Sequence, residues 1–262
     1  MAVIDGVFVP RSPLTAAESH VDFPAHNEHL LDARQRVERA ALPVAERIPF
    51  LIFTFLPAPP TQTAASQLAR VLARELERTA RFGYAQAQAE VERARAHAAV
   101  TAAHVLPDAG RYGEIARLGL EQVLAFVARR ALLTALAVTD RIVQALTVEP
   151  DHTRALYAGR DIARRSLHNH VLELVGETLN LGRTAGALDM ATPPEFALRS
   201  EQLDANTCIP CDGLHGTITR VGSPEYFAIL PPSGCLGGGR CRAIMVFSDG
   251  PRDVRQPERL AA

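Results

Sequence analysis

The sequence predicts a mainly α-helical protein, an elongated bundle of three long helices followed by a small C-terminal β-rich module that contains four cysteines. Residues 61–190 are rich in Ala, Arg, Glu and Gln, which favour helices, and apolar residues recur there at every third or fourth position. Residues 191–247 instead hold short β-like runs separated by Gly, Pro, Asp and Ser, and all four cysteines lie there. These two observations define the fold class.

Residues 1–60 are expected to form a mixed N-terminal docking segment. Val3–Val9 alternates as a short strand would, and Leu30–Val44 has helical spacing. The apolar run Ile48–Leu56 is followed by three prolines within four residues. Because β-branched and aromatic residues bounded by prolines favour extended chain, this run is predicted to be a buried strand or a docking segment rather than a helix.

Three long helices are predicted within residues 61–190. They span approximately Ala64–Val105, Tyr112–Val148 and His152–Leu181, with breaks at Pro107 and Pro150. The third is expected to end near two glycines, at positions 182 and 186. Helices this long exceed the usual length of about 11–12 residues, which indicates an elongated antiparallel bundle.

Four strands are predicted within residues 191–247. They are Phe196–Ser200, Gly216–Val221, Tyr226–Leu230 and Arg242–Phe247. Residues 248–262, with two prolines and scattered charges, are predicted to be a disordered tail.

Composition excludes several classes of function. All the basic residues are arginine, 28 of them, so no lysine amine can form a Schiff base or complete a phosphate-binding loop. The formal net charge of −1 gives no overall attraction to nucleic acid or to an anionic membrane. The apolar stretch Leu118–Val138 is interrupted by Arg129 and Arg130, so no membrane-spanning helix is expected. Since no nucleophile, base and orienting group recur in a recognised pattern, we predict that the protein is not an enzyme.

The four cysteines form the strongest chemical signal. Cys208 and Cys211 are separated by two residues, and Cys235 and Cys241 by five. Two such pairs can close a tetrahedral site of four thiolates, the usual arrangement of structural zinc. Buried or free thiols are the alternative, and disulfides are a third, disfavoured by the absence of a secretory signal. We therefore predict a structural zinc ion held by Cys208, Cys211, Cys235 and Cys241.

Other candidate groups are weaker. His26 and His29 could share a metal on one helix face, but without a third ligand a solvated surface is the expected reading. His168 and His170 lie two residues apart in a helix, on nearly opposite sides, and so cannot share an ion. Two arginine groups are interpreted as solvated helix faces, with contact to DNA or an acidic partner as the alternative: Arg70, Arg74, Arg78 and Arg81, and Arg160, Arg164 and Arg165.

The cysteine region resembles the C-terminal module of the phage Mu F-like minor head proteins, the head morphogenesis family. The pattern D-x-x-T-C-x-x-C-x-x-L-x-G of that family is matched by Asp204, Thr207, Cys208, Cys211, Leu214 and Gly216. Its later P-P…C-R is matched by Pro231, Pro232, Cys241 and Arg242. The chain departs from the family at His215, where an Asp is usual, and where Cys-x-Cys has become Cys235-x5-Cys241.

The resemblance implies a structural protein of the tailed-phage virion, a minor capsid component that associates with the portal and capsid proteins during head assembly in the host cytoplasm. It is compatible with a homo-oligomer around the portal and with contact to packaged DNA. The alternative hypothesis is a zinc-stabilised nucleic-acid-binding protein, suggested by the cysteines and the arginines.

Overall fold

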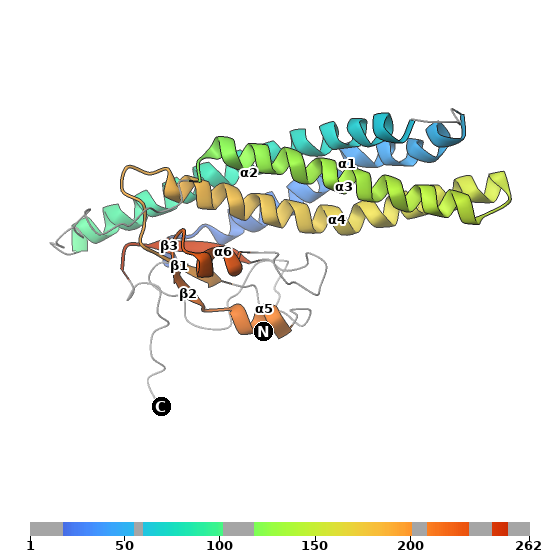
Figure 1. The fold of residues 1–262 in the computed structure, drawn as a ribbon. Helices are drawn as coiled ribbons and strands as arrows, with labels where there is room; N and C mark the ends of the chain where they lie inside the picture. The colour runs from blue at the N-terminus through green and yellow to red at the C-terminus, as the bar shows by residue number, and fades with distance from the viewer. Residues whose placement is uncertain (1–17, 55–59, 102–117, 201–208, 231–242, 251–262) are drawn as a thin grey trace.

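The computed structural model describes residues 18–54, 60–101, 118–200, 209–230 and 243–250 (Figure 1). Its elements, in chain order, are η1 (Glu18–His20), α1 (Phe23–Thr54), α2 (Pro60–Thr101), α3 (Leu120–Val148), α4 (His152–Leu188), β1 (Phe196–Ser200), α5 (Ile209–Leu214), β2 (Ile218–Arg220), α6 (Pro224–Ala228) and β3 (Ile244–Ser248). A mainly helical bundle with a small sheet is therefore confirmed, but four long helices form it instead of three.

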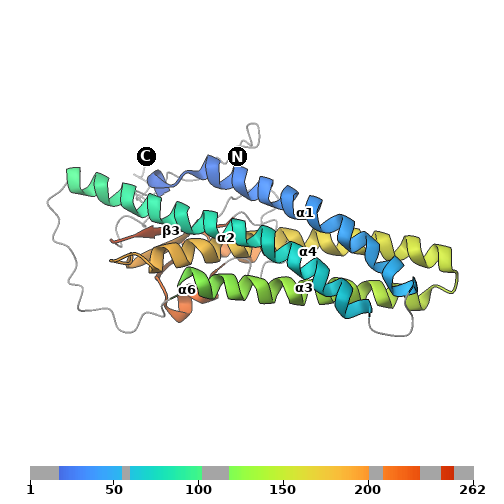
Figure 2. The same ribbon diagram turned by 90° about the horizontal axis from the view of Figure 1, so that it is seen from above.

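The four long helices lie side by side in an elongated bundle, and the small sheet lies against one part of it (Figure 1). α2 and α4 each pack against the other three helices, while α1 and α3 have little contact with one another. Seen from above, α1 and α3 therefore form opposite edges of the bundle (Figure 2). The helices share one apolar core, in which Leu68, Leu72, Ile142 and Leu179 are fully buried.

The prediction that Ile48–Leu56 forms a strand is wrong for its described part, because α1 continues through residue 54. Ile48 and Ile52 are buried, whereas Phe50 is exposed. Ile48 and Ile52 continue the buried stripe of Ala41 and Ala45 at helical spacing, and this stripe packs into the core of the bundle. Burial along one face outweighs the β propensity of the individual residues and the proline at position 49.

Glycines bring α2 and α4 into backbone contact along the same stretch. A Cβ atom on Gly182 would lie 2.1 Å from the carbonyl oxygen of Ala80, and one on Gly186 would lie 2.2 Å from that of Tyr84. From α2, a Cβ on Gly83 would lie 2.3 Å from the oxygen of Leu179. The expectation that α4 ends near these glycines is therefore wrong: they lie within the helix and permit the close approach of the two backbones.

The three strands form an antiparallel sheet in the order β2-β1-β3. On one face, Ala197, Met245 and Phe247 share a core with Ala87 and Val91 of α2 and with residues of α4 and α6. On the other face, Leu198, Ile244 and Val246 pack against Phe23 at the start of α1. Both faces of the sheet are thus covered, and the module has no core separate from that of the helices.

Three strand predictions are confirmed and one is wrong. β1 has the predicted bounds, and β2 and β3 overlap their predicted ranges. The predicted strand Tyr226–Leu230 is wrong, because its first three residues belong to helix α6. The side chain of Ser223 caps this helix by accepting a hydrogen bond from the amide of Tyr226, and Pro224 occupies the first turn. Ser248 belongs to β3 rather than to a disordered tail. Residues 251–262 and the predicted strand Val3–Val9 lie outside the described residues.

Among the described helices, α3 alone meets the length and the hydropathy that a membrane-spanning helix needs. Its most apolar window has a mean hydropathy of 1.4. A core helix of a bundle meets the same criteria. One face of α3 does pack against α2 and α4.

We predict that Gly182→Ala lowers the free energy of unfolding by about 2 kcal/mol or more, because the new methyl group would overlap backbone that cannot move aside. Gly176→Ala in the same helix is the matched control, since a Cβ there meets nothing within 4 Å. This second variant should raise stability by up to about 1 kcal/mol through helix propensity. Urea unfolding followed by circular dichroism measures both, and equal effects of the two substitutions would contradict the close approach.

Candidate functional site

Of the four predicted zinc ligands, the structure describes Cys211. It lies on α5 and is buried, and the guanidinium of Arg199 donates a hydrogen bond to its Sγ at 3.6 Å. Cys208, Cys235 and Cys241 lie outside the described residues.

The strands that border the other cysteines in the sequence are paired with one another. Ser200, the last residue of β1, pairs with Ile244, the first residue of β3. Cys208 follows β1 in the sequence, and Cys235 and Cys241 precede β3. The described residues include no group of three or more His, Cys, Asp and Glu side chains placed to hold a metal.

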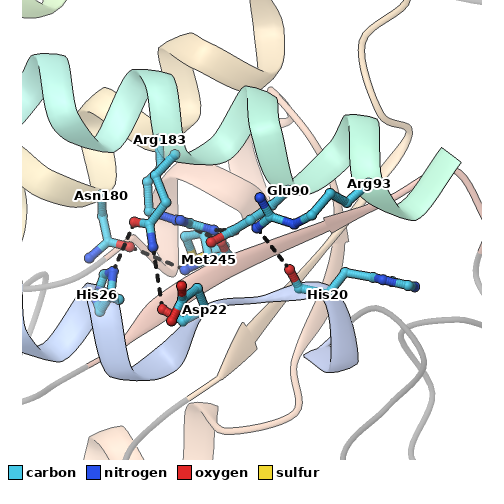
Figure 3. A network of polar contacts seen from close by, with 9 residues as sticks. His20, Asp22, His26, Glu90, Arg93, Asn180, Arg183 and Met245 are labelled. Atoms are coloured by element: carbon cyan, nitrogen blue, oxygen red, sulfur yellow. Dashed lines mark hydrogen bonds and ion pairs between the residues drawn. The ribbon is translucent and has the colours of Figure 1, made fainter. Parts of the chain in front are cut away.

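The most extensive buried polar cluster lies where the helices meet the sheet (Figure 3). It consists of Glu90 from α2, Asn180 and Arg183 from α4, and the backbone of Met245 in β3. We call these four residues the junction network. Sequence reasoning did not identify it as a site.

Two side chains of α4 form hydrogen bonds with backbone groups on the edge of β3 that does not face β1. Asn180 donates from Nδ2 to the carbonyl oxygen of Ala243 at 2.9 Å, and its Oδ1 accepts from the amide of Met245 at 3.1 Å. Arg183 donates from Nε and Nη2 to the carbonyl oxygen of Met245 at 3.2 and 3.0 Å. Because β3 is an edge strand of this sheet, these bonds occupy the backbone groups that a further strand would otherwise use.

The Arg183 guanidinium is fully buried and is neutralised by an ion pair. Its Nη2 lies 2.5 Å from Oε2 of Glu90, which is also buried. The ring of Phe247 lies beneath the guanidinium, 5.9 Å from ring centroid to Cζ. Within the described residues, Oε1 of Glu90 and Nη1 of Arg183 have no hydrogen-bond partner. Removing either partner would therefore leave a buried charge without compensation.

His26 is buried, contrary to the expectation of a solvated surface. Its Nδ1 lies 3.4 Å from Oε1 of Gln86, and its Nε2 has no partner in the part of the chain that the structure describes. Burial, together with the nearby positive charge of Arg183, lowers the pKa of His26 to about 3. On the same helix His29 stacks on Phe82 with ring centroids 3.6 Å apart, and burial lowers its pKa to about 4. Both imidazoles are therefore neutral at pH 7.

Three further contacts join the C-terminal region to the helices. The carboxylate of Asp249 receives two hydrogen bonds from Arg95 of α2, each of 2.7 Å. The hydroxyls of Thr184 and Tyr226 lie 2.6 Å apart, linking α4 to α6. Arg95 also donates to the carbonyl oxygen of Thr192 at 2.8 Å. The sheet is thus fixed to α2 and α4 at several points.

The surface arginines are largely paired with carboxylates. Arg160 and Arg164 of α4 both contact Glu46 of α1, and Arg165 contacts Asp161. On α2, Arg78 pairs with Glu75 and Arg81 with Glu77, while Arg70 and Arg74 are exposed. These faces match the solvated-face interpretation.

His168 and His170 are not arranged to share an ion. His168 is exposed and its Nδ1 lies 2.5 Å from Oε1 of Glu38. His170 is half-buried on α4, and burial lowers its pKa.

Comparisons of the chain with family models, with curated proteins and with solved structures found no match.

One sequence signal points to the junction network in retrospect. Gly182 and Gly186 lie four residues apart within a segment of otherwise helical character. Small residues at this spacing indicate that a second helix approaches closely, and Arg183, which directly follows Gly182, then lies beside that contact. Glu90 has no comparable signal, because its role depends on a partner distant in the sequence.

We predict that Glu90→Gln lowers the free energy of unfolding by about 3 kcal/mol, because it leaves the buried guanidinium of Arg183 unpaired. The matched control is Glu77→Gln, which breaks an exposed ion pair on the same helix and should change stability by at most about 0.5 kcal/mol. Chemical unfolding at neutral pH gives both values. A loss for Glu90→Gln no larger than that of the control would show that the buried pair does not stabilise the fold.

We also predict that the protein loses stability as the pH falls below about 6.5, the ordinary pKa of histidine. The pKa of His26 is lower in the folded state, so below this pH the unfolded chain binds a proton that the folded chain does not. The slope from His26 is at most about 1.4 kcal/mol per pH unit, and the effect is absent above the unfolded pKa. Unfolding curves from pH 7.5 to 5 measure it. His26→Gln should reduce the slope without abolishing it, because burial also lowers the pKa of His29 to about 4.

Proposed function

We propose that this protein is a structural component of a tailed-phage head, a minor capsid protein that binds the portal and capsid proteins during assembly. Its place would be the virion, after assembly in the host cytoplasm. The observation that carries the proposal is the spacing of Thr207, Cys208, Cys211, Leu214 and Gly216, with Cys241 and Arg242 following, which resembles the head morphogenesis family.

The way in which the cysteine-bearing module is attached to the helices supports a structural role. The junction network and the contact of Arg95 with Asp249 fix the sheet to α2 and α4, and both faces of the sheet contribute to shared cores. A module held in this way keeps a constant position relative to the long helices. A protein that links two parts of an assembly requires this property.

The charge distribution favours protein partners over nucleic acid. Arg160 and Arg164 share the carboxylate of Glu46, and Arg165 pairs with Asp161, so two carboxylates offset most of the charge that this face would offer to phosphates. By contrast, α3 exposes a row of large apolar side chains, including Phe126 and Leu133. An apolar helix face is a common feature of protein-binding surfaces.

Mass spectrometry of purified phage heads tests the proposal. We expect the chain in immature heads, in mature virions, or in both, at a low copy number relative to the major capsid protein, and retained after nuclease treatment. Its absence from both kinds of head would refute the proposal. Binding to DNA that weakens steeply between about 50 and 200 mM salt, together with absence from heads, would support the nucleic-acid-binding alternative.

We further propose that the four cysteines hold one structural zinc ion. Cys208→Ser should lower the zinc content from about one equivalent per chain and loosen the C-terminal module, because each thiolate completes a tetrahedral site. His215→Gln is the control, since four thiolates already fill the coordination sphere. Elemental analysis of the purified protein measures the metal. Protein that contains no metal and has four freely titrating thiols would refute the site.

A further inference from the structure

Helix α3 has two faces rich in apolar residues, and among the described residues only one of them is buried in the bundle. The inner face packs in the bundle and consists of small or β-branched residues with a few larger ones: Val123, Val127, Ala131, Thr134, Ala135, Val138, Thr139, Ile142 and Leu146. The outer face carries Phe126, Leu132, Leu133 and Leu136, which are between 37% and 48% exposed. The bulkier apolar residues in the middle of α3 are thus on the solvent side. Large apolar side chains gathered on one exposed face are a common feature of surfaces that bind a partner.

The outer face has the spacing of a coiled-coil seam. Phe126, Arg129, Leu133, Leu136, Asp140 and Val143 follow one another at alternating steps of three and four residues. Four of these six positions are apolar, and the other two carry opposite charges. Within the described part of the chain, neither Arg129 nor Asp140 forms an ion pair.

We propose that this seam is a self-association surface, on which α3 packs antiparallel against α3 of a second copy of the chain. A two-fold axis between residues 134 and 135 places Leu133 opposite Leu136 of the other copy and Phe126 opposite its Val143. The same axis places Arg129 opposite Asp140 of the other copy, twice in each dimer. A two-fold interface must be complementary to itself, and the order of residues on this seam meets that requirement in both charge and hydrophobicity.

The alternative alignment is less favourable. A parallel pair in register would bring Arg129 against Arg129 and Asp140 against Asp140, so that like charges would meet. A lipid surface would receive the apolar residues but would offer nothing to either charge at the middle of the seam. The charges therefore favour a second copy in the antiparallel direction.

The seam is short for a stable interface. From Phe126 to Val143 it extends for about 26 Å at 1.5 Å per residue. One helix pair of this length buries less area than a standard interface of about 1,600 Å². The dimer is therefore expected to have a dissociation constant on the order of micromolar or weaker and to be strengthened wherever copies are held close together. The inference does not depend on the proposed role in phage heads.

Sedimentation equilibrium of the full chain at low salt tests the proposal. The wild type should show a reversible monomer–dimer equilibrium. Leu133→Glu should raise its dissociation constant at least about tenfold, since the new charge would be buried against the other copy. The matched control is Leu31→Glu on α1, a leucine of similar exposure outside the seam, which should leave the equilibrium unchanged. Circular dichroism establishes that both variants fold.

Charge reversal tests the antiparallel register. Arg129→Asp and Asp140→Arg should each weaken the dimer by about fivefold or more, because each brings like charges together twice. The double variant should return to within about threefold of the wild type, because opposite charges meet again. Both charged residues are exposed, so these changes should not affect folding.

Three results would overturn the proposal. The first is a chain that stays monomeric at every concentration at which it is soluble. The second is a dimer that Leu133→Glu leaves intact or that the double charge reversal does not restore. The third is a monomer that binds vesicles of uncharged phosphatidylcholine through α3, with loss of binding in Leu133→Glu, which would assign the face to lipid.

Discussion

The burial of the Arg183 guanidinium between two helices and a strand is the constraint on which the rest of this structure depends. A fully buried cation requires an anion, and Glu90 on α2 supplies it at 2.5 Å. The pair can form only because glycines let the backbones of α2 and α4 approach closely, with Gly182 directly beside the arginine. Once the charge is neutralised, the remaining donors of the guanidinium bind β3. The side chain of Arg183 thus contacts both α2 and β3 and couples the packing of the helices to the position of the sheet.

The proposed self-association of α3 would account for the arrangement of its apolar residues. Ala131 and Ala135 face the core, while Leu132 and Leu136 are exposed. Small residues inside allow α3 to lie close to α2 and α4, and the large residues outside would be buried by the second copy. In this proposal the composition of the helix serves two interfaces.

The sequence was sufficient for features that depend on local pattern and insufficient for those that depend on distant partners. Helices α2, α3 and α4 and strand β1 follow from periodicity, and they overlap their predicted ranges. α1 was predicted only in part, as helical spacing over Leu30–Val44. The helical course of Ile48 and Ile52 was also visible as a continuing apolar stripe, but aromatic and β-branched neighbours favoured the wrong interpretation. Ser223 and Pro224 were likewise a visible signal, because a serine followed by a proline is typical of the start of a helix, here α6. The ion pair of Glu90 with Arg183 could not be predicted, because charged residues are usually expected at the surface and no local signal marks Glu90 as buried.

The junction network and the proposed zinc site would both stabilise the C-terminal region, the first by fixing β3 to the helices and the second by joining the cysteines between β1 and β3. Pairing of Ser200 with Ile244 closes a loop that contains all four cysteines. The contacts of Asn180 and Arg183 hold β3 at the base of this loop without any metal. Part of this loop is held by the shared core, because Val221, Tyr226 and Leu230 are buried there. Loss of the metal should therefore loosen the cysteine-bearing segments while the sheet stays attached to the helices. Loss of the buried ion pair should instead weaken the attachment of the sheet itself.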